Sequence, residues 1–484
     1  MWSDPRRRSP SRRTTPGRSR TRGPVWSAHP WSHGKRCGAD SPNPFCGSRL
    51  PSKCGCVKTA SMSRQYRVLR GMHDILPEEV GRWQFLEATT RERFAHYGFR
   101  EIRTPLLETT DLFARSVGAS SDIVRKEMYT ITRGDTSISL RPESTAPVVR
   151  AFIEHSRHRG IAAGYPERLF YMGPMFRYER PQKGRQRQFH QIGVEVLGGE
   201  EALIEAETIE MVWGLLKRLR IESIELQLGT VGDVTCRPKY REALREWLLS
   251  RVADMCEDCR RRADENPLRV FDCKVEADRQ MLIDAPTMGA FLCAPCDAHF
   301  SSVKQHLDTL GVPYVEDARL VRGLDYYRRT VFEITAAGLG AQNAILGGGR
   351  YDGLVRELGG QDVPGFGFAM GMERTVMLIP DEILPASTID VSLIALGTEG
   401  HHAAIGLAQR LRGQGVSVQI PMSDRPMGAQ LKRADRVDAR FALFVGQDEL
   451  KSGHYGLKDL RSGKQERLDE AGLVARLRTK DGGA

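Results

Sequence analysis

The chain has 484 residues, 40% of them hydrophobic and 27% charged, which is typical of a soluble globular protein with two or three domains. No apolar run approaches the length of a bilayer span, so no transmembrane helix is expected. The net charge of +11 lies in residues 1–61, where ten Arg and three Lys face only Asp4 and Asp40, so it gives no argument for nucleic-acid binding by the remaining chain.

Residues 1–61 are rich in Arg, Ser, Pro and Gly and show neither helical nor strand periodicity. Such a segment cannot bury enough surface to offset its ordering entropy. Three interpretations compete: a disordered basic tail, an organellar transit peptide, or untranslated sequence read from a start placed too early. Because globular-looking sequence begins at Met62, the third is favoured and the transit peptide comes second. We therefore expect a cytoplasmic protein, or an organellar one if this leader is a real transit peptide.

The first predicted helix begins at Pro77 and ends near Gly98. A strand-like run over 99–107 contains Pro105, which predicts a sheet edge or an interface. A second helix is predicted over 200–220. The apolar face of the first helix consists of Trp83, Leu86, Phe94 and Tyr97.

A cationic hairpin is predicted over 176–195, FRYERPQKGRQRQFHQIGVE. Arginine offers a planar fork for phosphate oxygens, and a strand holds it more rigidly than a loop tip does. Polar Gln191 and Glu195 alternate with apolar Ile192 and Val194, which favours a pocket floor over a solvated charged surface. The cations of the hairpin loop are Arg177, Arg180, Lys183, Arg185 and Arg187.

Two further segments carry polar groups that are weak signals when taken alone. LRPEST at 140–145 fits an amine site, but also a plain helix start with Ser144 or Thr145 near the cap. LVRGLDYY at 320–327 combines Arg322 and Asp325 with two tyrosines, although an Arg–Asp pair is more often structural than catalytic.

Two glycine-rich segments follow. GFGFAMGMER at 365–374 permits close backbone approach to a ligand, and Arg374 opens the next helix. The tract from Gly347 through Gly349 to Arg350 is interpreted as a loop, with ligand contacts only if other segments form a site beside it.

Residues 230–310 are charged, mostly helical in pattern and contain six cysteines, so they are interpreted as an insertion. The leader lacks the apolar core of a secretory signal, and we therefore expect thiols or metal ligands rather than disulfides. Two C-x2-C units suit one tetrahedral zinc site, and ordinary reduced thiols remain equally open. The tentative zinc set is Cys256, Cys259, Cys293 and Cys296.

A small α/β domain with its own core is predicted from about Thr388, after a linker bracketed by Pro380 and Pro385. Strands and helices alternate in this part of the chain. The strands are expected at 390–395, 416–420 and 441–445, and the helices at 403–412 and 430–437.

Taken in order, these segments resemble the class II aminoacyl-tRNA synthetases, and specifically the histidyl-tRNA synthetase family, from about Arg67 to the C-terminus. FREIRTPLLE is similar to the first class II motif, the hairpin to the second, and GFGFAMGMER to the third. LVRGLDYY and GGGRYDGL are similar to the histidine-specific signatures of the family.

The resemblance implies an α+β fold: an antiparallel sheet flanked by helices, with a helical insertion and a C-terminal α/β anticodon-binding domain. The catalytic domain would span 62–385, with the insertion at about 230–310, and the anticodon-binding domain 388–484. The implied activity is ATP-dependent attachment of L-histidine to tRNA(His) through histidyl-adenylate, with release of AMP and diphosphate. Mg²⁺ bound with ATP and a homodimer are also implied, and no membrane partner.

The resemblance also assigns roles to the arginines. Arg177 would hold the α-phosphate and the substrate carboxylate, and Arg322 would reach the α-phosphate from the opposite side. Both would be catalytic, because fixed cations stabilise the charge that develops on the phosphate oxygens. Arg374 would contact the adenine and the terminal phosphates, which gives an ATP-binding set of Arg177, Arg322 and Arg374.

The histidine site implied by the resemblance pairs both imidazole nitrogens, through Glu195 and Tyr327. Ser144 is a departure, because many relatives carry glycine there. The loop at Gln182 and Lys183 would meet the tRNA acceptor end. The complete histidine-binding set is Glu143, Ser144, Thr145, Gln191, Glu195, Tyr326 and Tyr327. Candidates for tRNA phosphate contacts, or equally for a solvated helix face, are Lys432, Arg433 and Arg436.

Two alternatives stay open. A regulatory subunit of ATP phosphoribosyltransferase shares the catalytic fold, but it usually lacks a full histidine-activating set and the C-terminal domain. A class II enzyme for threonine, proline or glycine is disfavoured by LVRGLDYY and Glu195.

Overall fold

The computed structural model describes residues 66–118, 121, 123–157, 165–182, 184–324, 326–340, 343–385, 389–421 and 425–478. The chain divides into two units, 1–65 and 66–484, so every described residue belongs to the second. The expectations for the leader 1–61, for Lys183, for Asp325 and for the domain start at Thr388 lie outside the described residues.

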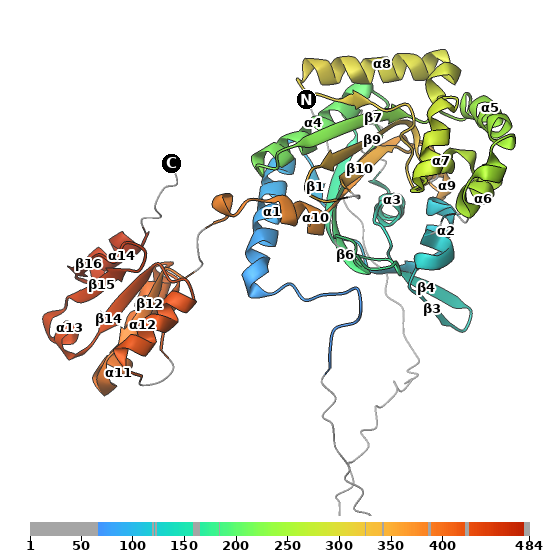
Figure 1. Cartoon of the computed structure of the whole chain (residues 1–484). Helices are drawn as coiled ribbons and strands as arrows, with labels where there is room; N and C mark the ends of the chain where they lie inside the picture. The colour runs from blue at the N-terminus through green and yellow to red at the C-terminus, as the bar shows by residue number, and fades with distance from the viewer. Residues whose placement is uncertain are drawn as a thin grey trace, which may run out of the picture. The chain divides into compact units, whose positions relative to one another are not determined.

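An eight-stranded sheet, in the order β1-β5-β6-β11-β10-β9-β7-β8, forms the centre of the larger domain (Figure 1). Its inner strands pair antiparallel, while the edge pairs β1–β5 and β7–β8 are parallel. The predicted hairpin is confirmed as its longest pair. The strands are β1 (Arg100–Glu101), β5 (Glu167–Phe176), β6 (Gln188–Leu197), β7 (Ile224–Thr230), β8 (Val315–Glu316), β9 (Arg328–Ala336), β10 (Ala344–Arg350) and β11 (Gly365–Gly371).

One face of this sheet is covered by helices α1 (Pro77–His96), α4 (Ala202–Arg218), α8 (Ala294–Thr309) and α10 (Met372–Leu378), which share its main core. Alternation along β6 explains the two faces, because Ile192 and Val194 enter this core while Gln191 and Glu195 point the other way. The first helix begins at Pro77 as predicted, and Trp83 and Leu86 on its apolar face are buried.

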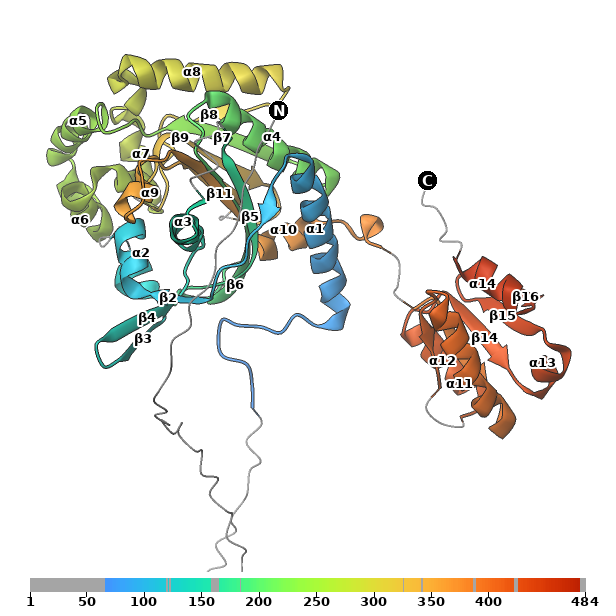
Figure 2. The same cartoon turned by 180° about the vertical axis from the view of Figure 1, so that it is seen from behind.

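The opposite face of the sheet packs on α3 (Thr145–Glu154) and α9 (Leu354–Glu357), and both views place α3 inside the curve of the sheet (Figures 1 and 2). The polar side chains of β6 therefore face α3 across a space closed by protein. Beside α3 lie α2 (Thr110–Val117), a π-helical turn (Ile123–Glu127) and a small antiparallel sheet of β2 (Leu107–Thr109), β4 (Thr136–Leu140) and β3 (Thr130–Arg133). The run predicted as one strand over 99–107 is instead divided between β1 and β2.

The glycine tract that was interpreted as a loop is strand β10, which lies between β9 and β11. Its glycines are buried because Arg322 and Tyr327 of the segment before β9, together with backbone of β9 and β11, occupy the space beside them. Arg350 ends the strand fully buried and donates to Glu205 of α4, whose carboxylate also contacts His299 of α8 at 2.7 Å. Burial raises the pKa of Glu205, but Arg350 and His299 together hold it below its ordinary value.

The insertion is helical, as predicted, and has a separate apolar core. It leaves the sheet after β7 and returns through α8 to β8. Its helices are α5 (Arg237–Leu249), α6 (Glu257–Glu265) and α7 (Glu276–Met281), joined by short 3₁₀ turns.

The C-terminal domain, taken by itself, is a five-stranded sheet in the order β13-β12-β14-β15-β16 with its own core. The three strands and two helices expected from the sequence are present as β12 (Val391–Ala395), β13 (Val418–Gln419), β14 (Phe441–Val445), α11 (Gly397–Gly413) and α12 (Met427–Arg436). Four further elements were not predicted: α13 (Gln447–Ser452), β15 (Tyr455–Asp459), β16 (Gln465–Leu468) and α14 (Glu470–Arg478). Among the helices that the structure describes, none combines the length and apolar character needed to cross a membrane.

Candidate active site

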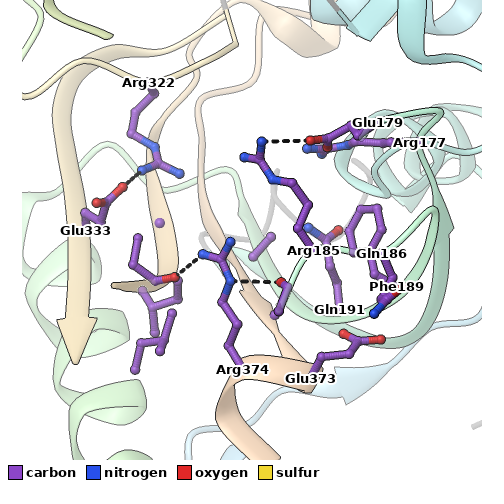
Figure 3. Close-up of a pocket in the computed structure, with 17 residues that line it drawn as sticks. Arg177, Glu179, Arg185, Gln186, Phe189, Gln191, Arg322, Glu333, Glu373 and Arg374 are labelled. Atoms are coloured by element: carbon purple, nitrogen blue, oxygen red, sulfur yellow. Dashed lines mark hydrogen bonds and ion pairs between the residues drawn. The ribbon is translucent and has the colours of Figure 1, made fainter. Parts of the chain in front are cut away.

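A cavity opens above strands β6, β11 and β10, and arginines from three distant parts of the chain line it. Arg177 follows β5, Arg322 belongs to the segment before β9, and Arg374 lies in α10. Figure 3 shows Arg322 with Glu333 on one side, Arg177 beside the ion pair of Arg185 with Glu179 on the other, and Arg374 between them. The sheet thus brings together the three arginines that the sequence nominated from separate segments.

Two of these cations are held in place by protein oxygens and an aromatic ring. The Nε of Arg177 donates to the carbonyl oxygen of Pro142 at 2.9 Å, and its guanidinium lies 5.2 Å from the centre of the Phe189 ring. Arg374 donates to the carbonyl oxygens of Gly184 (3.1 Å) and Ala344 (2.5 Å). Both side chains are therefore preorganised at the rim of the cavity.

Arg322 forms an ion pair with Glu333 of β9, and it lies over Gly347 of β10. A Cβ atom at Gly347 would come within 2.1 Å of the guanidinium nitrogen, so only glycine leaves room for this arginine. The glycine at position 347 of β10 is thus a steric requirement of the neighbouring cation.

Replacing Gly347 by alanine is expected to lower turnover by about tenfold or more, because the added methyl group displaces Arg322 and a small misplacement of a catalytic group is costly. Steady-state kinetics of the purified variant will measure this effect. Gly413→Ala is the matched control, since a Cβ there meets open space. Equal losses in the two variants would contradict the steric role of Gly347.

Glu143 lies just before helix α3 and is buried. Its two carboxylate oxygens accept backbone N–H groups of Thr145 (2.7 Å) and Ala146 (3.0 Å). Burial raises the pKa of Glu143, although these two N–H donors oppose the shift. Ser144 is the N-cap residue of α3, in line with the sequence, which placed Ser144 or Thr145 near the cap, but the side-chain contacts with the first N–H groups of the helix come from Glu143.

Glu195 lies on β6, opposite the start of α3, and is completely enclosed. One carboxylate oxygen accepts the Thr145 hydroxyl at 2.7 Å, and the other accepts the hydroxyl of Tyr351. Burial raises the pKa of Glu195 to about 8, and the neighbouring Glu143 adds to the shift, while the two hydroxyl donors oppose it. A carboxyl group of this kind titrates near neutral pH.

Tyrosines enclose this carboxyl group. Tyr326 lies between two other rings, with its ring centre 4.7 Å from that of Tyr327 and 5.7 Å from that of Tyr351. Glycines leave the space that these side chains need. A Cβ atom at Gly365 would lie 2.1 Å from the Tyr351 ring, and a Cβ atom at Gly367 would lie 2.4 Å from the carboxylate of Glu195. The floor of this compartment is therefore built from glycine backbone, and its walls from tyrosine rings and acids.

Two further predicted site residues, Gln191 and Ser144, differ in their position relative to the cavity. Gln191 lines the cavity, and its buried Oε1 atom has no hydrogen-bond partner among the described residues. Ser144 is fully buried but turns away, with its hydroxyl 3.4 Å from Thr104 Oγ1 and 3.5 Å from Arg141. Gln191 is thus available to a ligand, whereas Ser144 helps to fix the strand-to-helix turn.

Among the site residues that the sequence analysis missed are Glu333, Tyr351 and Glu373. Glu333 interrupts an apolar strand, which was a usable signal. Tyr351 follows the glycine tract, and its role was hidden while that tract was taken as a loop. Glu373 accepts the backbone N–H of His190 through both oxygens, at 2.8 and 3.0 Å, and fastens α10 to β6.

The predicted zinc set is wrong in its grouping. The structure assigns the two C-x2-C units to different clusters, one with Asp233 and Cys236, and the other with Cys273 and Asp278. Sequence spacing pairs neighbours along the chain, but the folded insertion brings each unit to a partner pair that is not C-x2-C.

A largely antiparallel sheet with a cavity lined by arginines from three segments, which resemble the class II motifs and the histidine-specific signature, defines a class II aminoacyl-tRNA synthetase. A profile of histidyl-tRNA synthetase matches residues 71–375, and a profile of an anticodon binding domain matches residues 390–480. The chain belongs to the histidyl-tRNA synthetase family.

Individual relatives agree. The histidine–tRNA ligase of Moorella thermoacetica is 48% identical over 409 residues, covering 84% of this chain and 96% of that protein. The crystal structure of apo histidyl-tRNA synthetase from S. aureus is similar, with a TM-score of 0.71 and 34% sequence identity. The match covers 85% of this chain and 100% of the S. aureus chain. A Bacillus halodurans protein described as an ATP phosphoribosyltransferase regulatory subunit/histidyl-tRNA synthetase shares the fold, at a TM-score of 0.57 and 22% identity over 79% of this chain and 98% of its own.

Proposed function

We propose that this chain attaches L-histidine to tRNA(His) in two steps, through histidyl-adenylate formed from histidine and ATP with release of diphosphate, and then AMP. The observation that carries the proposal is a cavity lined by arginines from three parts of the chain and by Gln191 of β6, the strand that also carries the buried Glu195. The arginines suit a triphosphate, and the buried carboxyl group suits an amino acid with a basic side chain.

In the first step the histidine carboxylate attacks the α-phosphorus of ATP. Arg177 and Arg322 reach the reaction centre from different elements, so their charges stabilise the oxygens of the α-phosphate as negative charge builds up there. Because arginine stays protonated, this stabilisation needs no proton transfer. Arg374 takes the adenine and the terminal phosphates.

The amino acid lies between β6 and α3. The α-amino group is bound by Glu143, Thr145 and the unpartnered oxygen of Gln191. One imidazole nitrogen donates to Glu195, which lies between two hydroxyls, and the other pairs with the Tyr327 phenol. A site that pairs both ring nitrogens rejects amino acids that lack them.

Mg²⁺ accompanies ATP in this proposal. It prefers oxygen ligands and binds through one or two carboxylates together with nucleotide phosphates. The cavity lining includes the carboxylates of Glu179 and Glu333, which are of the right kind to hold it. The ion would neutralise the departing diphosphate.

For tRNA we assign the loop at Gln182 to the acceptor end, and α12, with exposed Lys432, Arg433 and Arg436, to backbone phosphates. The proposed domains are 62–385 for catalysis, with an insertion at about 230–310, and 388–484 for the anticodon. A cytoplasmic homodimer completes the proposal. The match of an anticodon binding domain profile to residues 390–480 supports the tRNA assignment.

The test is exchange of labelled diphosphate into ATP, run with each amino acid in turn. We expect exchange with histidine alone, because a compartment closed by Glu195 and the tyrosines selects imidazole. Exchange with threonine, proline or glycine would overturn the specificity. A total lack of exchange, with binding to ATP phosphoribosyltransferase, would favour the regulatory alternative.

A further inference from the structure

The six cysteines of the insertion lie in two separate groups of four ligands, each completed by an aspartate. The first group is Asp233, Cys236, Cys293 and Cys296, and the second is Cys256, Cys259, Cys273 and Asp278. In each group the candidate ligand atoms all lie within 4.8 Å of one another. We propose that each group binds one Zn²⁺ ion, so that the insertion is a two-zinc module.

The spacing of the sulfur atoms matches a single ion and excludes a disulfide. Cys236 Sγ lies 3.9 Å from Cys296 Sγ, and Cys256 Sγ lies 3.8 Å from Cys273 Sγ. A tetrahedral zinc with bonds of about 2.3 Å places its sulfur ligands about 3.8 Å apart, whereas disulfide sulfurs lie about 2.05 Å apart. The geometry is therefore that of a shared metal.

The aspartates occupy the fourth corner of each group. Asp233 Oδ1 lies 3.3 Å from Cys236 Sγ, and Asp278 Oδ2 lies 3.2 Å from Cys273 Sγ. Asp278 is 2% exposed, and the contacts of its carboxylate among the described residues are with the backbone N–H of Cys256 (3.1 Å) and the Cys273 thiol, not with a cationic side chain. A buried carboxylate needs a counter-charge, and a divalent cation among three thiols supplies it.

Backbone N–H groups support the sulfurs, as expected for thiolate ligands. The N–H of Asp233 donates to Cys236 Sγ at 3.2 Å, and that of Val275 donates to Cys273 Sγ at 3.4 Å. Three thiolates select a soft or borderline ion such as zinc over magnesium or calcium. Four protein ligands leave no open position, so each site is structural.

The positions of the two groups in the chain explain why the insertion needs them. The first group joins residue 233, just after β7, to the start of α8, and so closes both ends of the insertion. The second ties α6 to the segment around α7. The separate apolar core is small for a segment of this length, and small cores depend on such cross-links.

The module also bears on the active site. Val321, next to Arg322, packs on the apolar core of the insertion, and Arg319 Nε donates to the Leu282 carbonyl at 3.1 Å. Loss of zinc should therefore loosen the segment that carries Arg322 and lower adenylate formation as well as stability.

Elemental analysis of the full-length protein, purified without added metal or chelator, tests the proposal. We expect two zinc ions per chain. The double variants Cys236→Ser/Cys296→Ser and Cys259→Ser/Cys273→Ser should each retain one. Full-length protein that is folded and active with only trace metal would overturn the proposal. If the full-length protein holds a single zinc ion, the double variant that keeps this ion identifies the group of ligands that binds no zinc.

Two controls keep the result specific. Replacing Cys37, Cys46, Cys54 and Cys56 by serine should leave two ions, and loss of zinc in that variant would place the metal in residues 1–61 instead. Asp233→Asn and Asp278→Asn should each lose zinc, whereas Asp284→Asn, at an exposed acid of the same insertion, should not.

Because a ligand variant can fail to fold, cobalt provides an independent measurement on the unaltered chain. Refolding with Co²⁺ should give the intense visible absorption of tetrahedral thiolate-bound cobalt, and the absorption should saturate at two equivalents. Absence of that absorption from the refolded, active protein would refute both sites.

Discussion

Replacing Arg322 by alanine is expected to lower the rate of histidyl-adenylate formation by about 10²–10³-fold while the protein stays folded. Arg322 faces the cavity opposite Arg177, and its positive charge is needed where negative charge develops on the α-phosphate. The loss should appear in turnover rather than in ATP affinity, because the contact strengthens in the transition state.

The fold should survive this change because the pair that it breaks is only partly buried. The side chains of Arg322 and Glu333 are 22% and 23% exposed, so water can solvate the glutamate that remains. Single-turnover adenylate formation and the melting temperature measure the two effects separately. Arg356→Ala, which removes an exposed arginine paired with Asp362, is the matched control. Normal turnover in Arg322→Ala would refute the catalytic role.

Replacing Glu195 by glutamine is expected to weaken histidine binding by about 10–100-fold, because the carboxyl group can ionise when it pairs with the imidazole and an amide cannot. The same change should alter how stability depends on pH. The pKa of Glu195 in the folded protein is about 8, against an ordinary value of 4.5. Between these values the folded state holds a proton that the unfolded chain has released.

The sign follows from that proton. As pH rises from 4.5 to about 8, the free energy of unfolding of the unaltered protein should fall through this group, because ionising a buried carboxyl is unfavourable. Glu195→Gln removes this pH-dependent contribution. The free energy of unfolding of the variant should therefore rise relative to that of the parent by about 1 kcal/mol per pH unit between pH 4.5 and about 8, and the difference should stay constant at higher pH.

Denaturant unfolding at several pH values, with calorimetric titration of histidine at each, measures both effects. Glu222→Gln is the matched control, because Glu222 is exposed on the same domain. A pH-independent difference between parent and variant would show that Glu195 is ionised throughout, and unchanged histidine affinity would remove it from the site.

Local patterns were enough to predict the hairpin and the first helix. The alternation of Gln191 and Glu195 with Ile192 and Val194 predicted which side of β6 faces the core, and Pro77 with the apolar face of α1 predicted that helix. These signals are local because each depends only on the period of one element.

The strand β10 and the metal ligands could not be predicted in this way. Three glycines in a row are typical of a loop. In the structure, however, Gly347 lies in a strand and leaves space for the guanidinium of Arg322, which comes from another segment. Likewise, C-x2-C spacing identifies ligands but not partners, since Asp233 and Cys273 reach their groups only through tertiary folding. In both cases the reason for a residue lies on a neighbouring element that is distant in sequence.

The buried contact of Glu205 with both Arg350 and His299 sets a limit on how this chain can be shortened. His299 belongs to α8, which follows the insertion, while Glu205 and Arg350 belong to the catalytic sheet and its covering helix. A natural or engineered deletion that ends before α8 leaves this charge cluster whole. One that extends past His299 removes a hydrogen-bond partner from a fully buried carboxylate, so the last helix of the insertion has to stay with the catalytic core.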